Sequence, residues 1–193
     1  SLITSLTEPA PARRRLRQWQ DSDFPTFAQM NADPIVMDWL GEPLDRASSD
    51  ALAHRLRTFI RDRGWGVWAI ELPQTQTFIG FTGLNIPPVP LPFKAHVEIG
   101  WRLAPAYWGQ GYATEAALEA LRIGFEILNL PEIVAFTATC NLRSQAVMDR
   151  LHMRRQPGTF EHPAVPIGSH LREQSWYRLT AQDFAFWNPR PLR

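Results

Sequence analysis

The stretch from residue 96 to residue 128 constrains the fold of this chain most. Residues 96–103 alternate apolar and polar side chains, a pattern that predicts a half-buried β-strand. A loop over residues 104–111 follows and contains Gly109 and Gly111. An amphipathic helix is then predicted from about Ala113 to Leu128. A strand that leads into a long helix through two glycines places the first turn of that helix at the end of a sheet strand.

This loop has the chemistry of a phosphate-binding site. Glycine tolerates left-handed backbone and lets a ligand approach closely. The first amides of a helix have no intrahelical partner and lie at the positive end of the helix dipole, so the backbone around Ala113 and Thr114 can hold an anion. A plain turn before a helix, or part of a dinucleotide fingerprint, would have a similar sequence. Thr114 stands where that fingerprint has its third glycine, and the Gly-Lys-Ser/Thr of a P-loop is absent.

The periodicity of the rest of the chain predicts helices and strands that share one mixed sheet. The four prolines in residues 86–94 predict a surface loop. Strands are expected at residues 15–19, 65–71, 77–84, 132–139, 153–160 and 172–179, and helices at 21–30, 34–40, 48–63 and 144–151. This order of elements indicates an α/β arrangement.

Composition narrows the class of protein. A chain of 193 residues with 45% hydrophobic residues suits a single domain, expected here over residues 1–193 with flexible tails at 1–12 and 188–193. The net charge of +1 gives no reason to expect binding to nucleic acid or membranes. Cys140 is the only cysteine and no apolar run reaches membrane-spanning length, so a cytoplasmic protein is expected. The five histidines show no metal-ligand spacing, and no metal is expected.

Several motifs together resemble the GNAT superfamily of N-acetyltransferases. The string Trp108-Gly-Gln-Gly-Tyr-Ala113 resembles the loop that holds the CoA pyrophosphate in that family. The wider string from Glu98 to Ala116 resembles the RimJ/RimL branch, which includes enzymes that acetylate the N-termini of ribosomal proteins. Residues 78–84, 141–151 and 175–179 are similar to the family's third strand, its Asn-x-x-Ser helix and its final strand. Two departures are Trp108, where many members have arginine or glutamine, and Leu151-His-Met153, where the family often reads Leu-Gly-Phe.

The resemblance implies the GNAT fold, a mixed and mostly antiparallel sheet of about six to seven strands flanked by helices. It also implies acetyl-CoA as cofactor, with the pantetheine arm pairing along the backbone of residues 101–103. The residues expected to bind the cofactor are Trp101, Arg102, Leu103, Trp108, Gly109, Gln110, Gly111, Tyr112, Ala113, Thr114, Asn141 and Ser144.

Acetyl transfer to an amine needs a neutral amine, and a general base helps to provide it. The pKa of an α-amine is about 8 and that of lysine about 10.4, so a lysine-like acceptor needs the base more. Glu98 is the expected base, because the resemblance places an acidic residue near this position and strand alternation sets it opposite Val97 and Ile99. The alternatives are a structural ion pair of Glu98 with Arg102, or His96 as the base.

The departing thiolate needs a proton donor, and the acceptor needs a pocket. The resemblance implies that Asn141 contacts the cofactor or splits the strand edge and so assists catalysis, and the alternative is a turn residue only. It also implies that Ser144 donates to the departing sulfur, and the alternative is a helix cap only. Tyr107 and Tyr112 are weaker candidates for the donor. Cys140 has no visible activating base and is read as a small, half-buried residue. Candidates for the acceptor pocket, each of which could instead be core, are Trp39, Trp65, Trp68 and Phe93.

The sequence therefore predicts an enzyme that moves an acetyl group from acetyl-CoA to a primary amine, either a protein or peptide N-terminus or a small amine. The resemblance implies direct attack with both substrates bound. A non-catalytic acyl-CoA-binding or regulatory protein of the same fold is the main alternative. A nucleotide-dependent enzyme of another class is disfavoured by the missing phosphate-loop lysine and third glycine. A monomer or homodimer is expected.

Overall fold

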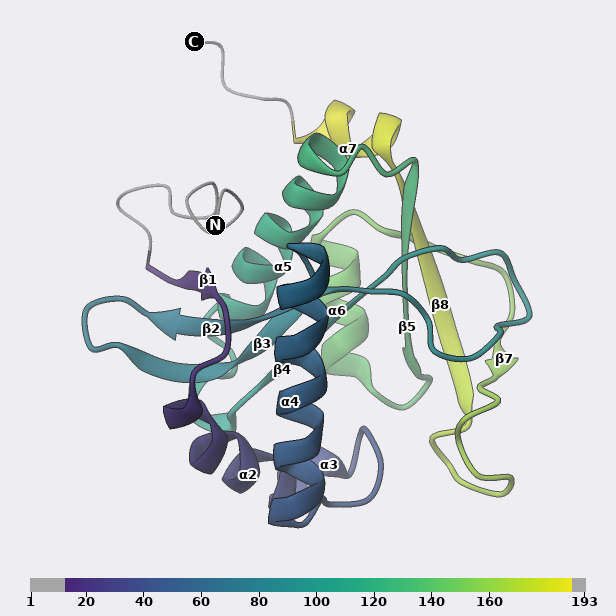
Figure 1. Cartoon of the computed structure of the whole chain (residues 1–193). Helices are drawn as coiled ribbons and strands as arrows, with labels where there is room; N and C mark the ends of the chain where they lie inside the picture. Colours follow the sequence, from purple (N-terminus) through teal and green to yellow (C-terminus); the bar gives the residue numbers. More distant parts are fainter. Residues whose placement is uncertain (1–12, 189–193) are drawn as a thin grey trace, which may run out of the picture.

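The computed structural model describes residues 13–188 and confirms an α/β fold around a mixed sheet (Figure 1). The strand order is β1-β2-β3-β4-β5-β8-β6, and β7 also pairs with β8. The strands are β1 (Arg15–Arg17), β2 (Val67–Leu72), β3 (Thr77–Asn85), β4 (Glu98–Leu103), β5 (Glu132–Ala138), β6 (Arg154–Arg155), β7 (Phe160–Glu161) and β8 (Glu173–Thr180). Each strand pair is antiparallel except β4 and β5, which are parallel.

Helices cover both faces of the sheet. On one face α4 packs against β2 and α2 packs against α4, with Trp19 and Phe27 forming an edge-to-face pair at 4.9 Å between ring centroids. On the other face α5 packs against β3 and β4. The helices are α2 (Phe24–Ala32), α3 (Pro34–Met37), α4 (Arg46–Arg63), α5 (Tyr112–Arg122), α6 (Leu142–Arg150) and α7 (Ala181–Trp187), with short helical segments η1 (Asp21–Asp23), η2 (Pro105–Tyr107) and η3 (Ile123–Ile127).

The sheet splits between β4 and β5. Glu98 and Val134 form the one bridge pair of these two strands, and the Val134 amide donates to the Val97 carbonyl oxygen at 3.1 Å. Beyond this bridge the strands diverge, and Figure 1 shows β5 and β8 running together while β2, β3 and β4 turn away. The split leaves the second half of β4 with a free edge at the centre of the molecule.

The ends of α4 and α5 are set by capping residues that the sequence contains, but one boundary of each helix differs from the prediction. Helix α4 begins at Arg46 rather than Ser48, because the Asp45 carboxylate accepts the Ser48 amide at 2.8 Å, and Gly64 ends it at φ 81°. The predicted helix 113–128 ends as an α-helix at Arg122 and continues as the π-helical turn η3. Gly124 lies in this turn and allows close packing, since a Cβ there would lie 2.7 Å from Ile133.

The other differences from the sequence predictions are local. The strand predicted from His96 begins at Glu98, and His96 is exposed outside it. The strand predicted over residues 153–160 is two short strands, because Pro157 and Gly158, the latter at φ 71°, turn the chain between them. Helix α7 was not predicted, and its buried Phe184 anchors it on the core. The tails expected to be flexible lie outside the described residues, apart from Asn188 at the end of α7.

Gly80 is required by the close approach of β3 and β4. Its φ is +148°, and an added Cβ would lie 2.1 Å from the Arg102 carbonyl oxygen. We expect Gly80→Ala to lower the free energy of unfolding by about 2 to 3 kcal/mol, through overpacking and backbone strain. Gly100→Ala on β4 is the matched control, because its Cβ meets nothing within 4 Å, and denaturant unfolding of both variants measures the difference. Equal stability of the two variants would contradict this packing.

Candidate functional site

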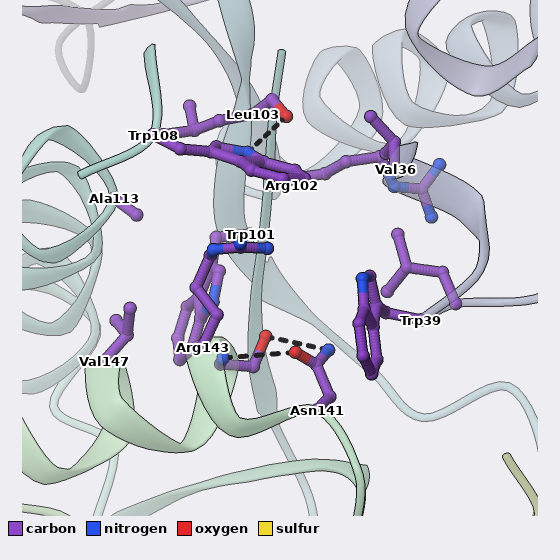
Figure 2. A pocket seen from close by; sticks show the side chains of 12 residues that line it. Val36, Trp39, Trp101, Arg102, Leu103, Trp108, Ala113, Asn141, Arg143 and Val147 are labelled. Atoms are coloured by element: carbon purple, nitrogen blue, oxygen red, sulfur yellow. Dashed lines mark hydrogen bonds between the residues drawn. The ribbon is translucent and has the colours of Figure 1, made fainter. Parts of the chain in front are cut away.

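The main pocket opens where β4 and β5 separate. Figure 2 shows Trp39 and Arg143 on opposite walls, with Asn141 between them. The walls come from α3 and the turn after it, from β4, from the start of α5 and from α6. The lining residues are Val36, Trp39, Leu40, Trp101, Arg102, Leu103, Trp108, Ala113, Asn141, Arg143, Ser144 and Val147.

The free edge of β4 forms one side of this pocket. Backbone polar groups alternate between the two edges of a strand, and Val97 bonds toward β5. Trp101 and Leu103 therefore direct their backbone groups to the same edge, which β5 has left. The Leu103 carbonyl oxygen accepts the Trp108 indole N–H at 2.9 Å, so the backbone of Trp101 remains for an extended ligand. The pairing of a pantetheine arm along residues 101–103 stays a prediction.

The glycine loop leads from this edge into the first turn of α5. Gly109 and Gly111 adopt left-handed conformations with φ of 73° and 84°, as the sequence predicted for a loop that turns sharply. Gly111 is the N-cap of α5 and has no side chain to accept the first amides of the helix. The amides of Tyr112, Ala113 and Thr114 thus surround a site that favours an anion.

Two arginines that the sequence reading did not select support this anion site. Arg143 stacks on the Trp108 ring at 3.7 Å from its centroid, and both Arg143 and Arg150 line the hollow beside the glycine loop. Trp108 stands where many family members have arginine or glutamine, and its ring provides the surface on which the Arg143 cation stacks. Arg143 and Arg150 come from α6, and their position beside the loop depends on tertiary packing that local sequence patterns do not contain.

Arg13, the first residue that the structure describes, stabilises the glycine loop. It donates to the Gln110 carbonyl oxygen at 2.6 Å and to both carboxylate oxygens of Glu115 at 3.0 and 2.9 Å. Gln110 itself is exposed, and its side chain donates to the Ala106 carbonyl oxygen. The ion pair with Arg13 offsets the negative charge of Glu115 in the first turn of α5, where it would otherwise repel an anionic ligand.

Asn141 and Ser144 lie together at the start of α6. Asn141 is the N-cap, because its side-chain oxygen accepts the Ser144 amide at 3.3 Å, so the alternative of Ser144 as the cap is wrong. The Asn141 amide nitrogen lies 3.1 Å from the Thr137 hydroxyl and 3.2 Å from the Ser144 hydroxyl oxygen. Ser144 accepts there, and its own hydrogen is left to donate to a group in the pocket.

Glu98 and Arg102 share one face of β4 but form no ion pair within the described residues. Burial raises the pKa of the Glu98 carboxyl to about 7, and the Asn85 side chain opposes this shift. Glu98 does not line the main pocket, whereas Arg102 does. Burial also lowers the pKa of Arg102 to about 10, and its Nη1 donates to the Asn31 side-chain oxygen at 2.8 Å. The alternative of a structural pair between Glu98 and Arg102 is not what this structure shows.

The remaining candidates for chemical roles, His96, Tyr107, Tyr112 and Cys140, do not line the main pocket. His96 lines a separate hollow with Trp176. Tyr107 and Tyr112 lie beside the glycine loop and outside the main pocket. Cys140 is half-buried and lines a wider hollow that adjoins the pocket through Trp39 and Leu40.

Of the aromatic residues considered for the acceptor pocket, Trp39 lines it and is 40% exposed. The other three serve packing. Trp68 is buried in the core, Trp65 packs on Phe59 and Phe93 stacks on Trp176.

Comparison with known proteins decides the family. Residues 13–154 match the family model described as an acetyltransferase (GNAT) domain. The chain belongs to this family. It is an N-acetyltransferase, and acetyl-CoA is its cofactor. The α/β fold predicted from the resemblance is confirmed.

Three similar proteins illustrate the range of this family. The FsC-acetyl coenzyme A-N(2)-transacetylase of Aspergillus fumigatus is 39% identical over 190 residues, covering 85% of this chain and 79% of that protein. The spermidine N-acetyltransferase of Vibrio cholerae, solved with CoA and spermine, has a TM-score of 0.70 at 20% identity, covering 89% of this chain and 98% of that one. The ribosomal L7/L12 acetyltransferase RimL, solved with CoA, has a TM-score of 0.69 at 17% identity, covering 91% and 98%. The last two similarities show the fold, and they do not select the RimJ/RimL branch.

Residues 13–188 contain neither a membrane-spanning helix nor a metal-binding cluster. In this part of the GNAT protein no helix combines the length and apolar character needed to span a membrane. In the same residues no group of three or more His, Cys, Asp or Glu side chains is arranged to hold a metal ion.

Proposed function

We propose that this acetyltransferase transfers the acetyl group directly to a primary amine while both substrates are bound, and that Glu98, Asn141 and Ser144 assist the transfer. The observation that carries the proposal is the free edge of β4 at Trp101, which runs into the uncapped first turn of α5. An extended chain that ends in phosphates fits this combination, because it can pair with a strand edge and place its anions at a helix N-terminus.

The residues present fit acetyl-CoA, which supplies the acetyl group as an activated thioester. We propose that Trp101, Arg102 and Leu103 would hold the pantetheine arm through their backbone. The amides from Gly109 to Thr114 would hold the pyrophosphate, with Arg143 beside them. Trp108 would orient this wall through its bonds to Leu103 and its stacking on Arg143.

Glu98 is the proposed general base. A carboxyl with a pKa of about 7 is ionised in a useful fraction near neutral pH. It can accept a proton from the substrate ammonium before attack, or from the nitrogen after the neutral amine has attacked the thioester carbon. Glu98 does not line the main pocket, so the proton reaches it from an amine beside the exposed position of Gly100, directly or through one water. Asn141 donates to the Ser144 hydroxyl oxygen, which leaves the hydroxyl hydrogen free to donate a hydrogen bond to the departing sulfur while solvent supplies the proton.

The acceptor is proposed as a peptide N-terminus or a small amine. The Vibrio structure contains spermine, which is a small amine, and the RimL structure is named as an alpha-N-protein acetyltransferase, so relatives of both amine types exist. The string from Glu98 to Ala116 favours the RimJ/RimL branch. We also propose that the protein is a single domain in the cytoplasm, as a monomer or homodimer; its free and half-buried Cys140 suits a reducing compartment.

Two-substrate kinetics test direct transfer. Initial rates of CoA release, measured across concentrations of acetyl-CoA and an amine, should give lines that intersect in a double-reciprocal plot. Parallel lines would indicate an acyl-enzyme, for which Cys140 would be the candidate nucleophile. Binding of acetyl-CoA with no amine-dependent release for any amine would indicate a non-catalytic binding protein of the same fold.

Arg143 provides a test of the cofactor site. We expect Arg143→Met to weaken acetyl-CoA binding by about 10-fold, because a charge-assisted contact to phosphate is lost, and the effect should shrink at high salt. Titration calorimetry measures both effects. Arg61→Met on α4 is the control, since Arg61 is 71% exposed and far from the glycine loop along the chain. Unchanged affinity in Arg143→Met would place the phosphates elsewhere.

A further inference from the structure

The face of β4 that carries Glu98 and Arg102 has two charged ends and an empty middle. Cross-strand pairs set this arrangement: Glu98 lies opposite Asn85, Gly100 opposite Gly83 and Arg102 opposite Phe81. Two paired glycines leave no side chain between the charged residues. Gly100 is exposed, and a Cβ there would meet nothing within 4 Å. Open space therefore lies over Gly100, between the positions of the Glu98 carboxylate and the Arg102 guanidinium on this face of the strand.

Both charged groups have polar atoms without partners. Among the described residues, Glu98 Oε2 and Arg102 Nε are buried and make no hydrogen bond. A buried cation without a carboxylate partner is costly in a folded protein. A ligand that supplies the missing charge would remove this cost, and here the two unpartnered atoms belong to groups of opposite charge.

The Arg102 guanidinium is held through one of its edges, and the other edge has an unpartnered donor. Its Nη1 donates to Asn31, and the Asn31 amide in turn donates to the Ser49 hydroxyl at 3.0 Å. Asn31 and Ser49 are fully buried, so this chain holds the guanidinium in place. The Nε side carries the unpartnered donor, and the edge formed by Nε and Nη2 is suited to bind both oxygens of a carboxylate. Figure 2 shows Arg102 reaching across the pocket toward Val36 of α3, on the wall that also carries Trp39.

We propose that the acceptor is an amine that also carries a carboxylate, bound across Gly100 with its carboxylate on Arg102 and its amine on the Glu98 side. This inference rests on the proposed function and narrows its acceptor to amino-acid-like molecules. The two charged residues are four positions apart, about 13 Å between Cα atoms at strand spacing, and the Glu and Arg side chains reduce the span that the ligand must cover. Peptide N-termini that lack a nearby carboxylate are poor acceptors on this account.

The test compares amino acids with their carboxamides. Each ω-amino acid from glycine to 6-aminohexanoate, and each of several α-amino acids, is assayed for CoA release beside its carboxamide. We expect at least one carboxylate to exceed its carboxamide in kcat/KM by roughly 10- to 100-fold. Arg102→Met should remove this preference, Arg102→Lys should keep part of it, and the control Arg61→Met should keep all of it. Unfolding curves and the acetyl-CoA-induced rise in midpoint verify that each variant folds and binds cofactor.

Gly100→Val tests the open space over Gly100 independently of charge. We expect it to raise the KM for amine acceptors while the acetyl-CoA-induced rise in midpoint stays the same. The inference is overturned if the wild type acetylates carboxamides as well as carboxylates, if Arg102→Met lowers both equally, or if Gly100→Val leaves KM unchanged. In each of these cases amine acetylation itself persists and the proposed function stands. The proposed function fails separately if no amine of either kind stimulates CoA release.

Discussion

Replacement of Glu98 by glutamine is expected to lower kcat by about 100-fold or more, with acetyl-CoA affinity unchanged. The variant keeps the shape of the side chain and removes its ability to accept a proton. Steady-state kinetics measure the loss, and titration calorimetry measures the affinity. In the wild type, kcat/KM should rise as pH increases through about 7, because the carboxyl must lose its proton before it can act as a base. The variant should lose this dependence.

The same substitution is expected to stabilise the fold above pH 7. A carboxyl whose pKa rises on folding binds a proton more tightly in the native state than in the unfolded state. The wild type therefore loses stability as pH rises from the unfolded pKa, about 4.3, through the folded pKa of about 7, and the loss is complete above it. Glutamine has no charge to bury, so Glu98→Gln should gain on the order of 1 to 3 kcal/mol at pH 8 relative to the wild type.

The combined result separates catalysis from structure. If Glu98→Gln is less active and more stable than the wild type, the Glu98 carboxylate is a group whose charge is buried for function at a cost in stability. Lower activity with lower stability would identify Glu98 as a structural residue. A Glu98→Gln variant with the same rate and the same pH dependence as the wild type from pH 6 to 9 would reject Glu98 as the base and return attention to other groups near Gly100.

Arg17→Met is expected to have the largest effect on stability, about 3 to 5 kcal/mol. Arg17 lies in β1 and is buried, and its guanidinium donates to Asp23 at 2.8 Å and to Glu71 at 3.0 Å. Asp23 and Glu71 are themselves buried. Removal of the cation leaves the buried Asp23 carboxylate without its ion pair and leaves Glu71 with only the longer contact to Arg15 at 3.9 Å, which costs far more than the ion pairs contribute. Denaturant unfolding at pH 7 measures the change.

Two comparisons show whether the cost comes from the stranded carboxylates. The triple variant Arg17→Met, Asp23→Asn, Glu71→Gln removes all three charges and should recover part of the lost stability. Arg46→Met breaks the exposed pair of Arg46 with Asp50 on α4 and should change stability by less than about 0.5 kcal/mol. Equal losses in Arg17→Met and Arg46→Met would contradict this account of β1.

The parts of the fold that the sequence predicted are those with a local physical signal. Alternation predicted β2, β3 and β5 within two residues at each end, and Gly64 predicted the end of α4. The glycine loop was predicted because only glycine adopts the left-handed conformations of Gly109 and Gly111 at no steric cost. In each case the residues that determine the feature are neighbours in the chain.

The parts that were missed depend on contacts between distant residues. Arg13 and Glu115 are 102 positions apart, so no local pattern shows that the N-terminal arginine stabilises the cofactor loop. His96 was placed on the Glu98 strand because alternation extends to it, but β4 begins only at Glu98. The open space over Gly100 follows from its register with Gly83, which sequence alone does not give.

The most direct test of the central claim is to incubate the purified protein with acetyl-CoA and single primary amines and to measure the acetylated amine by mass spectrometry. The account predicts one acetyl amide for each CoA released, in a reaction that depends on the amine and slows by about 100-fold or more in Glu98→Gln. CoA release that no amine accelerates, or equal product from wild type and Glu98→Gln, would contradict it.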